Sequence, residues 1–374
     1  MNERQSTKRL PYLDSARGLA AVSVITFHFF FAVYGSGLRA HYGSVSHLFW
    51  YGEANVIFFF IHSGFILAYA YAGGSAKLSL NYYIRFLIER IFRIYPLFLF
   101  ILVVSFVAIN NTPAYQYGTG EGYVELFWLQ KAGWRDLLNQ SLLVVRVPDS
   151  ANLRLIPQDW TLTVELLAGA AIPLLAFAGK RALLLFVGIL AVLKAGNFLT
   201  TYIFEFGLGV FLFLVRDHII KAWQRCNMFV RVMIGLLSIL FYSCFFIFPA
   251  FFSGEIVFID PRYDRVIVGL GCVLFFVVLL SSAKMQRILS LPFLVGIGRV
   301  CYSIYLLHEM LIFIFWRQWG DFLHQLQEKN VFIIALAYIA YLTLVILLAK
   351  LLFRIIEHPM NLLGKKIAGK ITAK

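Results

Sequence analysis

The first strongly apolar stretch of the chain contains charged and titratable side chains. Arg17 and His28 stand eleven positions apart, and Asp14 precedes Arg17 by one helical turn. At about 100° per residue these side chains share one helix face, with Arg17 and His28 about 16 Å apart along the axis. A charge inside a membrane helix costs about 2.5 to 3.5 kcal/mol on the insertion scale. The pattern therefore predicts a site for proton handling or group transfer. The simpler alternative is that Arg17 reaches the membrane surface and His28 makes one structural hydrogen bond.

Two other apolar stretches also carry polar residues. Glu165 follows Trp160 by a turn and a half of helix, so it can act in the site or hold a buried arginine such as Arg17. Ser63 and the glycine after it permit the close approach of another helix. His62, directly before them, is either a site residue or a packing histidine.

Basic and aromatic residues mark two more helices. Arg90 and Arg93 share a helix face, where they can bind phosphates through forked hydrogen bonds or simply fix the orientation of the helix. Tyr302, Tyr305 and His308 follow one another at a spacing of three and line one face. Such a face suits a polar cavity, or a hydrogen-bond network between helices without chemistry. These residues alone do not separate an enzyme from a proton-coupled transporter.

The composition indicates that lipid surrounds the helices that position these residues. The chain is 61% hydrophobic and 14% charged, with a mean hydropathy of +0.79, whereas soluble domains are about a quarter charged. We therefore predict an all-α, polytopic membrane protein of about ten transmembrane helices. The runs lie near 16–37, 52–72, 90–110, 160–178, 182–198, 201–216, 229–251, 265–283, 290–316 and 331–356. A tight turn around Asn197 and Thr200 is expected between the fifth and sixth.

The charge distribution predicts how the chain is oriented. The net charge of +14 is spread between the apolar runs, which argues against nucleic-acid binding and for orientation of membrane helices. The excess of Lys and Arg lies in one set of loops, which places both termini in the cytoplasm. Residues 111–159 then form an extracytoplasmic loop, whose aromatic residues face a sugar or anchor at the headgroups: Tyr115, Tyr117, Tyr123, Trp128 and Trp134. The four cysteines have no spacing that predicts a metal site or a disulfide framework.

Five motifs occur in order between Leu13 and Pro359. They are Leu13-Asp14-Ser15-Ala16-Arg17-Gly18-Leu19-Ala20 followed by His28; Phe59-Phe60-Ile61-His62-Ser63-Gly64-Phe65; Arg90-Ile91-Phe92-Arg93-Ile94-Tyr95-Pro96; Trp160-Thr161-Leu162-Thr163-Val164-Glu165; and Tyr302-Ser303-Ile304-Tyr305-Leu306-Leu307-His308. Together they resemble the membrane acyltransferase-3 family, whose members O-acylate bacterial surface polysaccharides. The chain departs from the family pattern at Ile57, His62 and Cys301, which leaves the choice of acceptor open.

The resemblance implies an O-acetyltransferase of the bacterial inner membrane, with acetyl-CoA as the cytoplasmic donor and a polysaccharide or lipid-linked glycan as the acceptor. His28 would be the general base or would carry the acyl group. Glu165, Arg17 and Asp14 would complete the catalytic set. The expected donor-binding residues are Arg90, Arg93, Tyr302, Tyr305, His308 and Ser63.

The family also implies one membrane domain over residues 1–374, with no metal and without the C-terminal hydrolase-like domain that some members carry. The rival interpretation is a non-catalytic carrier of a glycolipid or metabolite. A longer donor such as succinyl-CoA, a small hydrophobic acceptor and any oligomeric state remain open.

Overall fold

The computed structural model describes residues 10–34, 49–72, 79–112, 127–128, 130–143, 153–177, 179–195, 202–243, 261–326 and 330–371. Within these ranges the regular elements are helices, and no described residue forms a strand. The predicted all-helical class is therefore confirmed. The chain divides into two compact units, each built from segments that are far apart in the sequence. One comprises Met1–Ala20, Tyr42–Tyr83 and Val164–Arg299, and the other comprises Ala21–His41, Ile84–Thr163 and Val300–Lys374.

The first unit is organised around the contact of α2 with α7. Its helices are α2 (Gly52–Ala72), α6 (Lys180–Ala195), α7 (Ile203–Arg225), α8 (Met228–Tyr242), α10 (Pro261–Ser281), α11 (Ala283–Leu289) and α12 (Pro292–Arg299), with the start of α1 (Pro11–Tyr34) and most of α5 (Trp160–Phe177). A Cβ on Gly64 would strike the carbonyl of Phe206, and one on Gly209 would strike the carbonyl of Ile61. The glycine after Ser63 therefore does permit close helix approach, as predicted.

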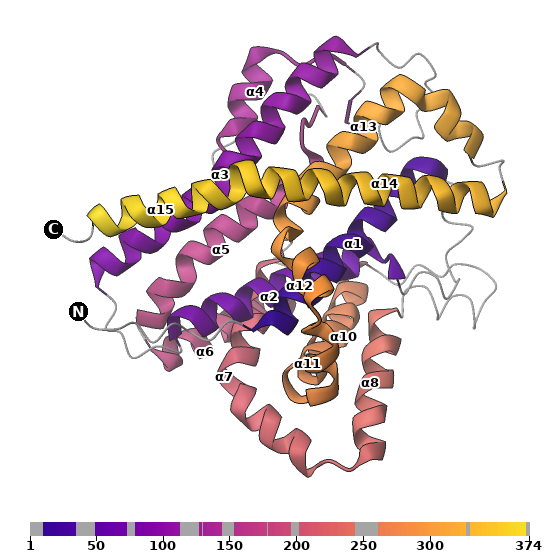
Figure 1. The fold of residues 1–374 in the computed structure, drawn as a ribbon. Helices are drawn as coiled ribbons and strands as arrows, with labels where there is room; N and C mark the ends of the chain where they lie inside the picture. The colour runs from indigo at the N-terminus through magenta and orange to yellow at the C-terminus, as the bar shows by residue number, and fades with distance from the viewer. Residues whose placement is uncertain are drawn as a thin grey trace. The chain divides into compact units, whose positions relative to one another are not determined.

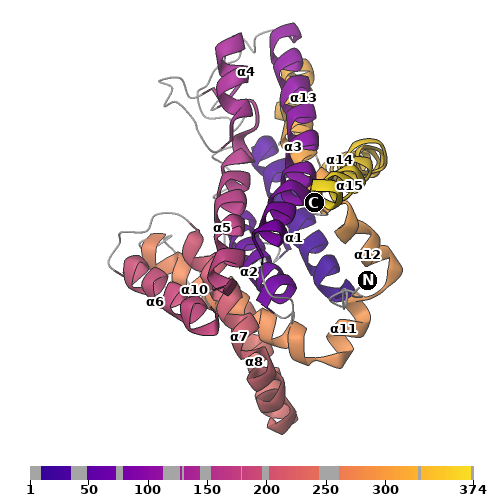
Figure 2. The same ribbon diagram turned by 90° about the vertical axis from the view of Figure 1, so that its left-hand side faces the viewer.

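The second unit contains the remaining helices and the rest of α1. They are α3 (Leu80–Asn111), α4 (Trp134–Ser141), the 3-10 turn η3 (Pro157–Asp159), α13 (Cys301–Leu326), α14 (Val331–Leu352), the π-helical turn η4 (Phe353–Glu357) and α15 (His358–Ile371). The last three form the long yellow helix of Figure 1. α4 lies beside the C-terminal part of α3 in both views (Figures 1 and 2), where the rings of Phe106 and Trp134 are 4.9 Å apart.

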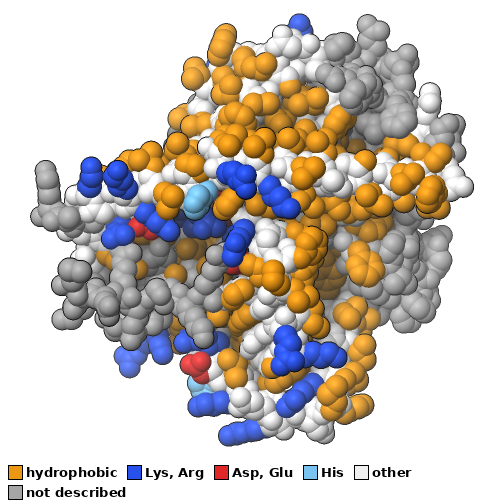
Figure 3. All heavy atoms as spheres, viewed as in Figure 1, with side chains coloured by type: hydrophobic (Ala, Val, Ile, Leu, Met, Phe, Trp, Pro, Cys, Tyr) orange, Lys and Arg blue, Asp and Glu red, His pale blue; other side chains and the backbone are white. Residues whose placement is uncertain are grey.

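Several helices are long and apolar enough to cross a membrane. Four meet that description in the described residues, namely Pro11–Tyr34, Gly52–Ala70, Leu80–Asn111 and Val331–Ile371, and two bent pairs raise the number to six. Large apolar side chains are exposed along α14, including Val331 at 77% and Phe332 at 67%, and hydrophobic side chains cover much of the face in Figure 3. Such surfaces suit lipid rather than water. The chain is therefore a membrane protein, while the count of ten spans stays a prediction.

Two predicted spans differ from the structure in shape. The run near 290–316 is broken into two helices, α12 and α13, and the break follows the glycine-containing stretch 296–298, a usual place for a sharp kink. The last run is predicted near 331–356, but the helix that contains it continues past Pro359 to Ile371. The π-helical turn before Pro359 widens the helix where the proline ring would otherwise strike a carbonyl of the preceding turn.

The segment predicted as an extracytoplasmic loop, 111–159, contains both buried and exposed aromatic residues. Trp128 is 1% exposed, donates its indole N–H to the Arg154 carbonyl at 3.1 Å and packs on Phe313. Trp134 is 72% exposed. Trp128 is thus a core residue, while Trp134 remains available to a membrane surface or a ligand. Tyr115, Tyr117 and Tyr123, like Asn197 and Thr200 of the expected tight turn, lie outside the described residues.

Candidate functional site

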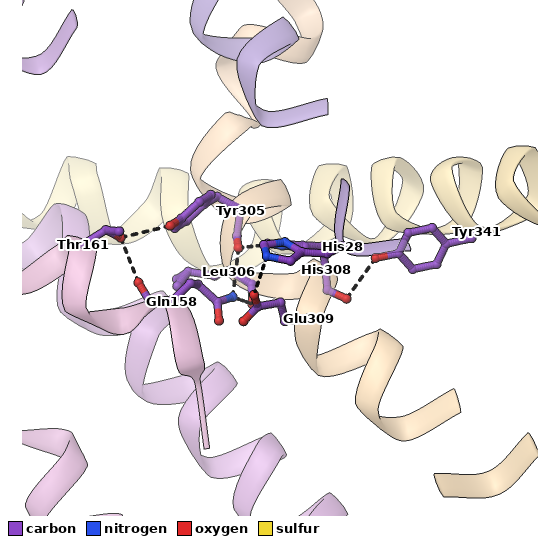
Figure 4. Close-up of polar contacts among 8 residues, drawn as sticks. All are labelled: His28, Gln158, Thr161, Tyr305, Leu306, His308, Glu309 and Tyr341. Atoms are coloured by element: carbon purple, nitrogen blue, oxygen red, sulfur yellow. Dashed lines mark hydrogen bonds and ion pairs between the residues drawn. The ribbon is translucent and has the colours of Figure 1, made fainter. Parts of the chain in front are cut away.

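His28, His308 and Glu309 form one connected polar cluster in the second unit (Figure 4). His28 Nδ1 lies 2.9 Å from His308 Nε2, and His28 Nε2 lies 3.2 Å from Glu309 Oε1. His308 Nδ1 lies 2.7 Å from the Tyr305 carbonyl oxygen. The imidazole of His28 is therefore held at both nitrogens, by two residues that are adjacent on α13.

The partners of these atoms determine where the hydrogens lie. The Tyr305 carbonyl can only accept, so His308 Nδ1 carries a hydrogen. If His308 is neutral, its Nε2 accepts from His28 Nδ1–H. His28 Nε2 and the Glu309 oxygen would then present lone pairs to each other unless one further proton lies between them. If His308 is instead doubly protonated, His28 Nε2 carries the hydrogen and donates to Glu309. Two neutral imidazoles and a carboxylate carry a net charge of −1. In each of the two arrangements the three side chains hold one more proton than that, so their net charge is zero.

Burial favours the state in which the cluster holds this shared proton. His308 is 0% exposed and Glu309 is 2% exposed, whereas the His28 side chain keeps 16% exposure. An uncompensated charge in such surroundings is strongly unfavourable. His28 is thus the least buried member of the cluster, and its two partners can accept or return a proton.

A second layer of hydrogen bonds holds His308 in place. Gln158, in the 3-10 turn before α5, donates its amide to the carbonyls of Tyr305 at 3.1 Å and Leu306 at 3.3 Å. Tyr341 on α14 donates its hydroxyl to the His308 carbonyl at 3.0 Å. Thr161 and the Tyr305 hydroxyl are 3.1 Å apart. These contacts join η3, α13 and α14 around the histidine pair (Figure 4).

The same cluster has the composition of a metal site. One ligand atom from each of His28, His308 and Glu309 lies within 4.8 Å of the others, and two histidines with a glutamate are a known zinc set. However, the 2.9 Å between the two imidazole nitrogens is a hydrogen-bond distance. Two nitrogens on a tetrahedral zinc ion would lie about 3.3 Å apart. A zinc ion would therefore require the rings to separate.

The predicted catalytic residues are distributed over both units. Asp14 and Arg17 lie on the part of α1 that belongs to the first unit, and both are half-buried. Glu165, on α5, is half-buried in that unit too. Arg17 and His28 do share one continuous helix, as predicted.

The predicted donor-binding residues also have different surroundings. Arg90 is buried, with its guanidinium 5.9 Å from the centre of the Phe86 ring, and Arg93 is exposed. Tyr302 donates its hydroxyl to the Ile94 carbonyl at 2.7 Å, which ties α13 to α3.

The other three residues of that set are Tyr305, His308 and Ser63. Tyr305 contacts Thr161 through its hydroxyl and His308 through its carbonyl. His308 contacts His28 rather than an arginine. Ser63 is half-buried on α2. His62, directly before it, is buried, and its Nε2 lies 3.2 Å from the Leu13 carbonyl oxygen.

The sequence interpretation did not assign a role to Glu309, Gln158 or Tyr341. Glu309 carried a usable signal, because it is a carboxylate inside an apolar run and follows His308 directly. Gln158 and Tyr341 carried none, because their role depends on which helix faces them.

Comparison with known proteins gives a family but no individual relative. No curated protein and no solved structure matches the chain. The model of the family described as an acyltransferase domain matches residues 10–352. With that match over most of its length, the chain belongs to the acyltransferase-3 family of membrane acyltransferases.

Proposed function

We propose that the protein transfers an acetyl group from cytoplasmic acetyl-CoA to a hydroxyl of a cell-surface glycan, with His28 as the general base. The observation that carries this proposal is the contact of His28 with both His308 and Glu309. A hydroxyl must lose its proton as it attacks a thioester, and a positioned histidine with a proton-accepting partner supplies that function.

The proposed step begins with the cluster one proton short of its neutral form. The acceptor hydroxyl donates a hydrogen bond to His28 Nε2, on the side that faces Glu309. Its oxygen then bonds to the thioester carbonyl carbon while the O–H bond breaks, and the proton is shared by His28 and Glu309. The carbon–sulfur bond breaks next, and the proton passes to the sulfur of CoA. The products are the glycan ester and CoA, and the cluster returns to its starting state.

A transient acyl-histidine is the other route open to the same residue. It would require one nitrogen of His28 to give up its present partner, since Nδ1 faces His308 and Nε2 faces Glu309. In the general-base route Nδ1 keeps its contact with His308, and the proton taken up at Nε2 restores the contact with Glu309. An acyl group on Nε2 would instead keep Glu309 away, which favours the general-base route.

The remaining assignments follow the family motifs. Arg90 and Arg93 bind the donor phosphates at the cytoplasmic side, and Asp14, Arg17 and Glu165 position the reacting groups. Ten spans in the inner membrane, with both termini in the cytoplasm, would let the donor arrive on one side and the glycan on the other. The acceptor is a polysaccharide or a lipid-linked glycan.

The test is acetyl transfer in membranes that contain the full chain. Labelled acetyl-CoA is supplied, and label is measured in polysaccharide from the producing cell. His28→Ala should reduce the transfer at least about 100-fold, while His218→Ala, an exposed histidine on α7, should leave it unchanged. Transfer that survives His28→Ala would refute the catalytic assignment. Binding of a glycolipid without any label transfer would favour a carrier.

A further inference from the structure

The C-terminal helix of the chain is much longer than a membrane is thick. The helix from Val331 to Ile371 has 41 residues, which is about 60 Å, against about 30 Å for the hydrocarbon layer. The apolar part of this helix is α14. Charged residues begin at Lys350, in the last turn of α14, and continue with Arg354, in η4. α15 therefore projects beyond the apolar layer.

α15 packs against the basic half of α3. A Cβ on Gly364 would strike Cβ of Phe92, so the two backbones approach each other closely at this point. Ala368, one turn later on the same face of α15, is 0% exposed. α15 is thus a docked helix of the second unit, and Figure 1 shows it beside the N-terminal part of α3.

Three cations that the sequence separates by more than 250 positions stand within two residues of this contact. Arg93 follows Phe92, while Lys365 and Lys366 follow Gly364, and all three side chains are exposed. Arg85 has a partner in Glu89 at 2.8 Å. In contrast, no acidic side chain of the described residues lies within ion-pair distance of Arg93, Lys365, Lys366 or Lys370. Figure 3 shows Lys and Arg side chains gathered over this end of the long helix.

Cations that lie close together without counter-charges repel one another. An anion that binds among them removes this repulsion. Phosphate suits such a surface, because arginine and lysine both give it charge-assisted hydrogen bonds. We propose that α15 and α3 together form a phosphate-binding surface, in which Lys365 and Lys366 act with Arg93.

The phosphate can come from the donor or from a lipid. CoA carries a pyrophosphate and a 3′-phosphate, and an anionic lipid carries a phosphodiester at the same membrane surface. The donor version rests on the proposed function, and the lipid version does not. α15 lies beyond residues 10–352, which the family model matches, so the family motifs do not supply these lysines.

The experiment measures binding rather than turnover. The purified full chain is reconstituted in nanodiscs of phosphatidylcholine, with or without phosphatidylglycerol. The dissociation constants of CoA and of dephospho-CoA, which lacks the 3′-phosphate, are measured together with the enrichment of phosphatidylglycerol around the protein. The variants are Lys365→Ala/Lys366→Ala and, as a control with the same change of charge, Lys284→Ala/Arg287→Ala on α11, where both residues are exposed.

If the surface binds the donor, the α15 double variant should weaken CoA binding about 10-fold or more and lose the preference for CoA over dephospho-CoA. If it binds lipid, the variant should lose the phosphatidylglycerol enrichment and keep its affinity for CoA. If the wild type does not bind CoA, acetyl-CoA is not the donor and the proposed function is rejected. The phosphatidylglycerol measurement alone then tests the phosphate-binding surface. Equal behaviour of both double variants in both assays would overturn the phosphate-binding surface.

A second pair of variants tests the packing without changing any charge. Gly364→Ala should displace α15 from Phe92. It should therefore weaken the same binding, of CoA or of phosphatidylglycerol, that the lysine double variant weakens. Gly369→Ala, at a glycine of α15 whose Cβ would meet no atom within 4 Å, should bind as the wild type does. If Gly364→Ala folds and retains full binding, the joint surface is wrong.

Discussion

His28 Nδ1 lies 2.9 Å from His308 Nε2, across a separation of 280 positions in the sequence. The rings are stacked, with centroids 5.0 Å apart and an angle of 26° between their planes. Because His308 is fixed in turn by the Tyr305 carbonyl, the contact sets both the orientation and the hydrogen positions of His28. The reactivity proposed for His28 is therefore a property of the cluster.

Replacing Glu309 should separate its proton-accepting role from its structural role. In Glu309→Gln the amide can still donate to His28 Nε2, but it cannot take up a proton. We expect kcat to fall by about 100-fold or more, as for the loss of an acid–base group, with little change in KM for acetyl-CoA. Glu309→Asp should retain part of the activity. Wild-type kcat in Glu309→Gln, with the protein folded, would show that the carboxylate takes no part in the proton transfer.

The second imidazole should be required for turnover, while its outer contact should matter mainly for stability. His308→Phe removes both the partner of His28 Nδ1 and the bond to Tyr305, so we expect a large loss of kcat. Tyr341→Phe removes only the bond to the His308 carbonyl, at a cost of about 1 kcal/mol in the free energy of unfolding. Both variants are purified, and kcat and the thermal unfolding temperature are measured for each. His308→Phe should lose kcat, and Tyr341→Phe should mainly lose stability. A Tyr341→Phe protein as inactive as His308→Phe would contradict it.

Metal removal distinguishes the hydrogen-bonded cluster from a metal centre with the same residues. Incubation with a strong chelator followed by dialysis should leave acetyl transfer unchanged if the cluster works through its shared proton. Metal analysis of the active protein should then find less than one equivalent. Loss of activity that zinc restores would instead show that His28, His308 and Glu309 are ligands.

The α2–α7 contact should tolerate no side chain at Gly64. In Gly64→Val the new side chain would strike the Phe206 carbonyl, and overpacking of this kind costs about 1 to 3 kcal/mol or more. Gly235→Ala is the matched control, because a Cβ there meets no atom within 4 Å, and alanine favours a helix by about 1 kcal/mol over glycine. Unfolding in detergent should show a less stable Gly64→Val and an unchanged or more stable Gly235→Ala.

The buried pair of Lys194 and Glu205 should be coupled. Lys194 Nζ lies 3.2 Å from Glu205 Oε1, with 13% and 2% of the two side chains exposed. Removal of either partner leaves a buried charge and should cost about 3 to 5 kcal/mol. Lys194→Met/Glu205→Leu should recover much of that loss. Additive effects in the double-mutant cycle would show that the pair does not interact.

Helical periodicity and charge were enough to predict several features of the site. They placed Arg17 and His28 on one helix, singled out His308 inside an apolar run and located the pair of arginines on α3. They worked because each depends on spacing within one helix, where about 3.6 residues make a turn. The same reasoning placed the end of the last run near residue 356, because the sequence does not reveal the π-helical turn that accommodates Pro359.

The sequence by itself determined that this protein is helical, that it belongs in a membrane and that it carries the motifs of an acyltransferase. The tertiary structure decided that His28 meets His308 and Glu309, and that α15 packs on α3 where Gly364 faces Phe92. The physical reason is that spacing along a chain fixes which side chains share a helix face. Which face meets which is decided by the packing of helices, through close contacts such as that of Gly364 with Phe92.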